Sequence, residues 1–308
     1  MILCCGEALI DMIPAPTAEG RTGFVPHPGG AVFNTAIALG RLGAAAGLLT
    51  GLSTDMFGAQ LAEALTASHV DASLAIRADR PTTLAFVQLI DWQAQYSFYD
   101  ENSAGRMLTS ADMPALPEQI TALFFGGISL ACEPAADAYA ALLAREGKTR
   151  AVMLDPNIRP GFIEDAERYR TRLNAMLQEA DIVKVSDEDL GWIIPDAPSL
   201  AEKVAVLRER GPAVVIVTRG GEGATGHLPD GTEVQVPAER TAVVDTVGAG
   251  DTFNAGVLTK LSQMGRLTKD ALATLSASDL QEAMAYGAKV AAVTVSRVGA
   301  DPPWSSEL

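Results

Sequence analysis

The chain has 308 residues, of which 48% are hydrophobic and 20% are charged. This balance is typical of a compact globular protein and excludes a long disordered chain. The formal net charge of −15 opposes nonspecific binding to nucleic acid, which requires a basic surface.

The N-terminal residues lack a basic lead and reach acids at Glu7 and Asp11, so they predict a first strand rather than a signal peptide. The longest charge-free apolar stretch, residues 119–132, is shorter than the roughly 20 residues of a membrane helix. We therefore expect a cytoplasmic protein without a membrane span. Three cysteines lie in apolar segments, where reduced, buried thiols are expected: Cys4, Cys5 and Cys132.

Two β-prone runs, residues 83–90 and 94–99, are joined at residues 91–93 with no helix between them, which predicts a hairpin. With residues 12–28, the hairpin forms either a small β lid over a site on the main sheet or an antiparallel extension at the edge of that sheet. We expect one domain, residues 1–308, with a lid from about 12–28 and 83–106.

From residue 151 onward, β-prone apolar runs alternate with helical patterns. Strands are expected at residues 151–155, 182–185 and 213–218, and helices at 167–180 and 200–210. This alternation predicts a doubly wound α/β fold, with a mainly parallel sheet, helices on both faces and ligands at the carboxyl ends of the strands.

Two phosphate-binding patterns fail on their context. Residues 221–226 satisfy G-x-G-x-x-G, but the turn at residues 229–231 leads into a β-prone run instead of a helix, so a dinucleotide fold is not indicated. Gly147-Lys148-Thr149 ends like a P-loop, yet the first glycine of that motif would fall at Leu142.

The small residues Gly248, Ala249 and Gly250 precede a helical run over residues 252–264. Their amides would converge at a helix N-terminus, which favours an anion. Asp251, in the first helical turn, is either a stabilising first-turn acid or a base that takes a hydroxyl proton beside a phosphoryl group. The glycines favour the base, because a simple cap does not require such close approach to the backbone.

Residues 245–258 resemble the C-terminal signature of the PfkB carbohydrate kinases, and residues 29–36 and 39–43 resemble the N-terminal one. The likeness continues through residues 6–11, 155–160, 218–223 and 296–300. It implies a ribokinase-like fold with a β lid, ATP and Mg²⁺, and transfer of the γ-phosphoryl group to a sugar hydroxymethyl.

The resemblance also implies roles for individual residues. Asp251 matches the base, and the amides of Gly248, Ala249 and Gly250 match the anion hole. Sugar-binding positions are matched by Asp11, Gly29, Gly30 and Asn34. ATP-binding positions are matched by Lys184, Ser186, Thr218, Gly220, Gly221 and Gly223. Asp245, Val247 and Gly299 match a monovalent cation site, from which we expect K⁺ to activate the enzyme.

Each assignment has a plainer alternative. Asp11 is interpreted as a carboxylate at the carboxyl end of a strand that accepts sugar hydroxyls, although it could cap a turn. Asn34 could be an ordinary polar residue of a helix surface. Arg159 is interpreted as a sugar or phosphate contact because an acidic chain must gather cations at an anion site. Arg106 contacts sugar, contacts phosphate, or only pairs with Asp100 or Glu101.

Two segments depart from the family pattern. Residues 186–189 read Ser-Asp-Glu-Asp, where the family often has Asn-x-x-Glu near Mg²⁺. An Asn often found beside the adenine is replaced within residues 285–288, so the adenine contacts there stay open.

Residues 99–108 and 184–187 resemble those of bacterial and plant fructokinases, which makes fructose the expected acceptor. A 2-keto-3-deoxygluconate kinase, or another kinase of the family, is the alternative enzyme. A non-catalytic sugar sensor is the alternative from another class, and the intact segment 248–251 argues against it. One sequence leaves the oligomeric state open, a homodimer included.

Overall fold

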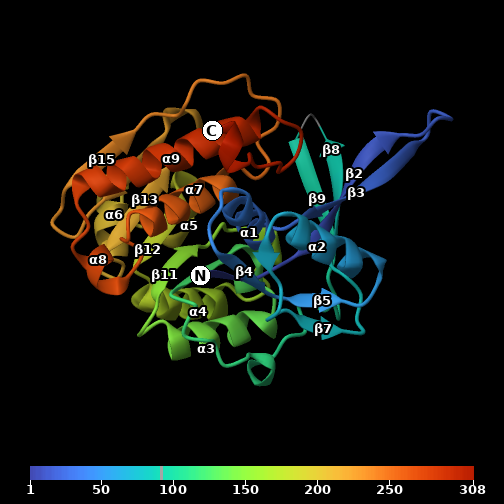
Figure 1. Ribbon diagram of the computed structural model, residues 1–308, viewed down its shortest axis with the longest axis horizontal. Helices are drawn as coiled ribbons and strands as arrows, with labels where there is room; N and C mark the ends of the chain where they lie inside the picture. The colour runs from blue at the N-terminus through green and yellow to red at the C-terminus, as the bar shows by residue number, and fades with distance from the viewer. Residues whose placement is uncertain (91–92) are drawn as a thin grey trace.

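The computed structural model describes residues 1–90 and 93–308 (Figure 1). Its main sheet has the strand order β15-β14-β13-β12-β11-β10-β1-β4-β6. The strands are β1 (Ile2–Cys5), β4 (Ala46–Leu49), β6 (Val70–Asp71), β10 (Ala122–Gly126), β11 (Ala151–Asp155), β12 (Ile182–Ser186), β13 (Val214–Thr218), β14 (Ala224–His227) and β15 (Glu233–Val236). Neighbouring strands run parallel from β6 to β13, and β14 and β15 are antiparallel at one edge.

Helices cover both faces of this sheet, because its strands are apolar on both sides. In β1, Ile2 and Cys4 join one core, and Leu3 and Cys5 join the other. The first core is closed by α1 (Ala31–Arg41), α2 (Met56–Ala67), α7 (Ala249–Gln263), α8 (Lys269–Ala273) and α9 (Ala277–Val295). The second is closed by α3 (Ala135–Glu146), α4 (Ala166–Glu179), α5 (Asp187–Ile193) and α6 (Leu200–Arg208). The predicted doubly wound α/β fold is confirmed.

A separate sheet, here called the small sheet, projects from the main body (Figure 1). Its order is β3-β2-β8-β9, formed by β2 (Leu9–Pro16), β3 (Thr22–Gly29), β8 (Leu84–Ile90) and β9 (Gln93–Tyr99). Strands β8 and β9 are the predicted antiparallel hairpin; residues 91–92 of its predicted turn lie outside the described residues. The alternative of an extension of the main sheet is wrong, because the small sheet shares no strand with it.

A third, two-stranded sheet pairs β5 (Gly51–Ser53) with β7 (Ile76–Ala78). Short 3₁₀ helices follow several strands. Those that reach the site are η2 (Gly127–Leu130) after β10, η3 (Pro160–Phe162) after β11 and η4 (Gly220–Glu222) after β13. Within residues 1–90 and 93–308, every helix is too short or too polar to cross a membrane.

Candidate functional site

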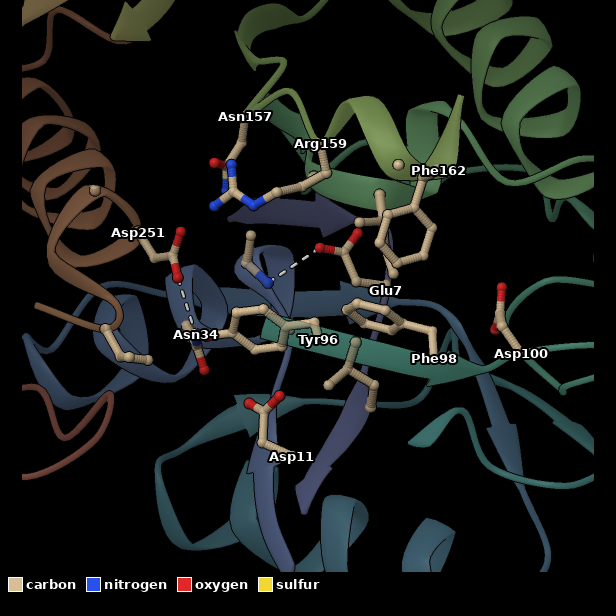
Figure 2. A pocket seen from close by; sticks show the side chains of 18 of the residues that line it. Glu7, Asp11, Asn34, Tyr96, Phe98, Asp100, Asn157, Arg159, Phe162 and Asp251 are labelled. Carbon is tan, nitrogen blue, oxygen red and sulfur yellow. Dashed lines mark hydrogen bonds between the residues drawn. The ribbon is translucent and has the colours of Figure 1, made fainter. Parts of the chain in front are cut away.

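A cavity of about 710 Å³ lies between the carboxyl ends of the main strands and the small sheet (Figure 2). We call it the larger cavity. The small sheet contributes Leu9 and Asp11 from β2 and Tyr96 and Phe98 from β9. The main body contributes the start of α1, the start of α7 and the loops that follow β10 and β11.

Asp251 lies in the first turn of α7 and is 8% exposed. The Nδ2 of Asn34 donates a hydrogen bond of 2.9 Å to its Oδ2 (Figure 2). Burial raises the pKa of Asp251 to about 7, and the negative charge of Asp155 adds to the rise. The hydrogen bond from Asn34 and the positive charge of Lys184 oppose it. A carboxylate with a pKa near neutrality suits a general base. Asn34 is itself buried, so the alternative of an exposed polar residue is wrong.

The helix N-terminus beside Asp251 requires glycine. Gly248 caps α7 with a φ of 77°, in the left-handed region that glycine adopts without strain. A Cβ there would lie 2.6 Å from the Cβ of Ala300. The N–H groups of the first turn have no partner within the helix, and a helix N-terminus favours an anion. The N–H of Ala249 donates to the carbonyl of Thr246 at 3.3 Å.

A buried cation adjoins these amides. Lys184, 5% exposed, places its Nζ 3.0 Å from Oδ2 of Asp155. The same oxygen accepts a 2.7 Å hydrogen bond from Nδ2 of Asn254, one turn beyond Asp251 on α7. A Cβ on Gly250 would lie 3.1 Å from the Lys184 Nζ. The ammonium group therefore lies against the helix N-terminus, where it can contact a phosphate.

A second cavity of about 320 Å³, the smaller cavity, adjoins the first. Thr246, Ala249 and Gly250 line both. Four of the six residues matched to ATP-binding positions line the smaller cavity: Thr218, Gly220, Gly221 and Gly223. The rest of its wall is mainly apolar and includes Val243, Phe253, Ala288, Ala291, Ala292 and Val295. It is thus the place where a flat, largely apolar ring system would fit.

Ser186 lies apart from both cavities. Its hydroxyl caps α5 and accepts a hydrogen bond of 2.9 Å from the backbone N–H of Asp189. Asp189 is buried, and its carboxylate accepts a hydrogen bond from the N–H of Ile158 at 3.0 Å. The side chain of Ser186 is therefore engaged in holding the helix.

Asp11 lies inside β2 of the small sheet, so its expected place at the end of a main-sheet strand was wrong; β1 ends earlier, at Cys5. Its carboxylate covers Gly29, where a Cβ would lie 2.1 Å from Oδ2. Burial raises the pKa of Asp11 to about 6. Asp11 points into the larger cavity (Figure 2). Gly30, with a φ of 104°, is the N-cap of α1.

Two arginines line the larger cavity and differ in their partners. Arg159 points into the cavity from the side opposite Asp11 (Figure 2), and its hydrogen bond runs to the carbonyl of the preceding residue at 3.1 Å. Arg106 donates to the carbonyl of Glu133 at 3.0 Å and lies 3.1 Å from Glu164 and 3.7 Å from Asp100. The predicted ion pair of Arg106 with Asp100 is thus present. The second acidic partner of Arg106 is Glu164 and not Glu101.

The segments predicted to hold a monovalent cation meet. Asp245 accepts hydrogen bonds from the N–H of Val247 at 3.0 Å and from the N–H of Gly299 at 2.9 Å. Among the described residues no group of three or more His, Cys, Asp or Glu side chains has the arrangement of a metal site. A cation at this position would depend on backbone carbonyl groups.

Several residues of the larger cavity escaped the sequence analysis. Glu7 is buried at the carboxyl end of β1, a position that could have identified it as readily as Asp11. Phe98 of the small sheet meets Phe162 of the main body edge to face at 4.2 Å between ring centroids. The alternation of Tyr96 and Phe98 placed both on one face of β9. Phe162, the partner of Phe98 in the loop after β11, could not be found from periodicity.

Two adjoining cavities that meet at a helix N-terminus, with a buried carboxylate and a buried lysine there, are the arrangement of a phosphoryl-transfer enzyme. The model of the pfkB family carbohydrate kinases matches residues 1–307. The chain belongs to this family of carbohydrate kinases.

The chain is 51% identical, over 283 residues, to a fructokinase of Rhizobium leguminosarum bv. trifolii, covering 91% of this chain and 86% of that protein. It superimposes with a TM-score of 0.88 and 28% identity on a fructokinase with bound ATP from Xylella fastidiosa, covering 97% and 93% of the two chains. A fructokinase of Vibrio cholerae O395 with bound fructose, ADP and calcium ion gives a TM-score of 0.83 and 25% identity, with coverage of 97% and 94%.

Proposed function

We propose that this kinase is a fructokinase, which transfers the γ-phosphoryl group of ATP to the 6-hydroxyl of fructose. The observation that carries the proposal is the junction of the two cavities at the N-terminus of α7, where Asp251 is buried beside Lys184. The curated relative with 51% identity is named fructokinase, which supports fructose as the acceptor.

In the proposed reaction, Asp251 takes the proton of the sugar hydroxyl as it attacks the γ-phosphorus. The amides of Gly248, Ala249 and Gly250 face the transferred group, and the ammonium of Lys184 offsets its negative charge. Phosphoryl transfer depends mostly on such positioning and electrostatic stabilisation. Arg159 points into the same cavity, and we assign it to the sugar or the transferred phosphoryl group.

The acceptor sugar is assigned to the larger cavity. Asp11 offers a carboxylate that accepts hydroxyl hydrogen bonds, and Gly29 leaves room for that carboxylate. Asn34 has its Nδ2 on Asp251, which leaves its Oδ1 to accept from a sugar hydroxyl. The small sheet then acts as the lid, since it supplies Asp11, Tyr96 and Phe98 to the cavity.

ATP is assigned to the smaller cavity, with its phosphates directed toward Gly250 and Lys184. Mg²⁺ neutralises phosphate charge when bound. It commonly keeps several waters and takes few protein ligands, which fits residues that lack a preformed acidic cluster within the described part of the chain.

For K⁺, the proposed ligands are the carbonyls of Asp245 and Val247 and those of the segment before Gly299. Equal rates with and without K⁺ at fixed Mg²⁺ would contradict that assignment.

The test is ADP release by the purified protein with fructose, ribose and 2-keto-3-deoxygluconate, followed by ³¹P NMR of the product. We expect the highest kcat/KM with fructose and a phosphate on its 6-hydroxyl. A higher kcat/KM with either other sugar would contradict fructose and leave the kinase class intact. If no ADP is released with any of the three sugars, catalysis on these sugars is contradicted and the non-catalytic sugar sensor is favoured.

A further inference from the structure

Glu7 is a buried carboxylate to which neither the sequence patterns nor the proposed reaction assigns a role. It follows β1 and is 9% exposed, and it lines the larger cavity. Its Oε1 accepts from the N–H of Ala31 at 3.0 Å and, more weakly, from that of Val32 at 3.5 Å. Its Oε2 accepts from the N–H of Ser129 at 3.2 Å. One side chain thus joins the start of α1 to the 3₁₀ helix η2.

Two glycines make room for this carboxylate. A Cβ on Gly127 would lie 2.0 Å from Oε1 of Glu7, and one on Gly30 would lie 3.1 Å from its Cγ. The φ angles of Gly127 and Gly30, 67° and 104°, lie in a region that residues with a side chain rarely adopt. Both glycines line the larger cavity. The backbone on either side of Glu7 therefore closes around the carboxylate more tightly than other residues would permit.

Glu7 anchors the start of α1, and α1 in turn contacts Asp251 of α7. Ala31 begins α1, and Asn34 and Thr35 follow within one turn. Asn34 donates to the Oδ2 of Asp251. The Thr35 hydroxyl lies 3.2 Å from the backbone carbonyl of Asp251 and 3.0 Å from that of Ala31, and its single proton serves these two acceptors. A shift of the first turn of α1 would therefore move both atoms of α1 that hold the base.

The charge of Glu7 also affects the pKa of Asp251. The ionisable groups that act on Asp251 come from three strands or their ends: Asp155 is the last residue of β11, Lys184 lies within β12, and Glu7 follows β1. The negative charges of Asp155 and Glu7 raise the pKa of Asp251, whereas Lys184 lowers it. Burial raises the pKa of Glu7 as well, against the hydrogen bonds that its carboxylate accepts. In its ionised form Glu7 raises the pKa of Asp251, so loss of that charge would make the base weaker.

From this geometry we infer that Glu7 is a positioning residue, which sets the first turn of α1 and the η2 wall and thereby the place of Asp251 relative to the acceptor hydroxyl. The inference rests on the proposed role of Asp251 in the kinase. It does not depend on which sugar is the acceptor.

The test is Glu7→Gln, which keeps the shape but places an NH₂ group against one of the N–H donors. We expect kcat to fall about tenfold to a hundredfold, the cost of a small misplacement at a reacting centre, with KM for ATP within about twofold. The acid limb of the kcat/KM profile should move to lower pH, since the pKa of Asp251 falls. A solely structural role would change neither kcat nor that limb.

Asp181→Asn is the matched control, because Asp181 also accepts a backbone N–H, that of Val152, at 2.8 Å. It directly precedes β12 and so lies at the amino end of that strand, whereas the cavity lies at the carboxyl ends of the strands. We expect a lower Tm and an unchanged kcat.

If Glu7→Gln does not fold, Glu7→Asp decides the question, since it keeps the charge and shortens the reach. We expect a fall in kcat with the acid limb retained. Wild-type kcat in whichever variant folds would overturn the positioning role. All rates are measured with the best sugar of the panel, so a wrong assignment of fructose leaves this test valid.

Discussion

The two ends of the larger cavity are built differently. At one end, Asp251 and Lys184 are held by the first turn of α7 and by β12, inside the doubly wound core. At the other end, Asp11, Tyr96 and Phe98 stand on the small sheet, where Tyr96 is 45% exposed. The first end can hold fixed charges in a dry environment, and the second can be reshaped without disturbing the core. We infer that the first governs the chemical step and the second the choice of sugar.

The largest effect on the chemical step is expected from Asp251→Asn. We expect kcat to fall by about 10² to 10⁴, the usual contribution of a positioned general base, while KM for ATP changes less than a few-fold. Steady-state kinetics with fructose and ATP measure both. A variant that keeps a tenth or more of the wild-type kcat would remove Asp251 from the role of base.

The matching change at the other end is Asp11→Ala. A site built around sugar hydroxyls loses affinity when one of its buried polar groups is missing, so we expect KM for fructose to rise by about tenfold to a hundredfold. KM for ATP should stay within a few-fold. Equal increases in both KM values would show that the two ends are not separable.

A smaller effect concerns stability. Because burial raises the pKa of Asp251 from 3.8 to about 7, the folded protein binds more protons than the unfolded chain between these values. Its free energy of unfolding therefore falls as pH rises through that range. Asp251→Asn removes the buried charge, so we expect a Tm a few degrees above wild type at pH 8 and a smaller difference at pH 5. A lower Tm at pH 8, measured by scanning fluorimetry, would contradict this.

The smallest expected effect is that of Arg106→Ala. Arg106 is already paired with Asp100 and Glu164, and partly exposed pairs contribute about 0 to 1 kcal/mol. We expect kcat and both KM values within about threefold of wild type and a slightly lower Tm. A strong rise in fructose KM would instead indicate sugar contact, and a strong fall in kcat would indicate phosphate contact.

The sequence predicted the core end of the site better than the small sheet. The alternation of strands and helices and the small residues before Asp251 are local patterns, and the structure has the fold and the helix N-terminus that they indicate. Asp11 was assigned to the wrong strand because β1 is only four residues long and β2 resumes at Leu9.

Contacts between distant segments could not be read from periodicity. Glu7 meets Ser129 across more than a hundred residues, and Arg106 meets Glu164 from another loop. Such pairs depend on how the strand ends converge. No local pattern of residue types encodes that convergence.

Whether Asp251 is the base is tested most directly by the pH dependence of kcat/KM for the best sugar, measured from pH 5 to 9 with saturating ATP and Mg²⁺. A buried Asp251 that must be ionised to accept the proton predicts an acid limb with an apparent pKa of about 7, below which the rate falls tenfold per pH unit. Asp251→Asn should lose that limb. A rate independent of pH between 5 and 8, or a limb that survives in Asp251→Asn, would contradict the central role given to this carboxylate.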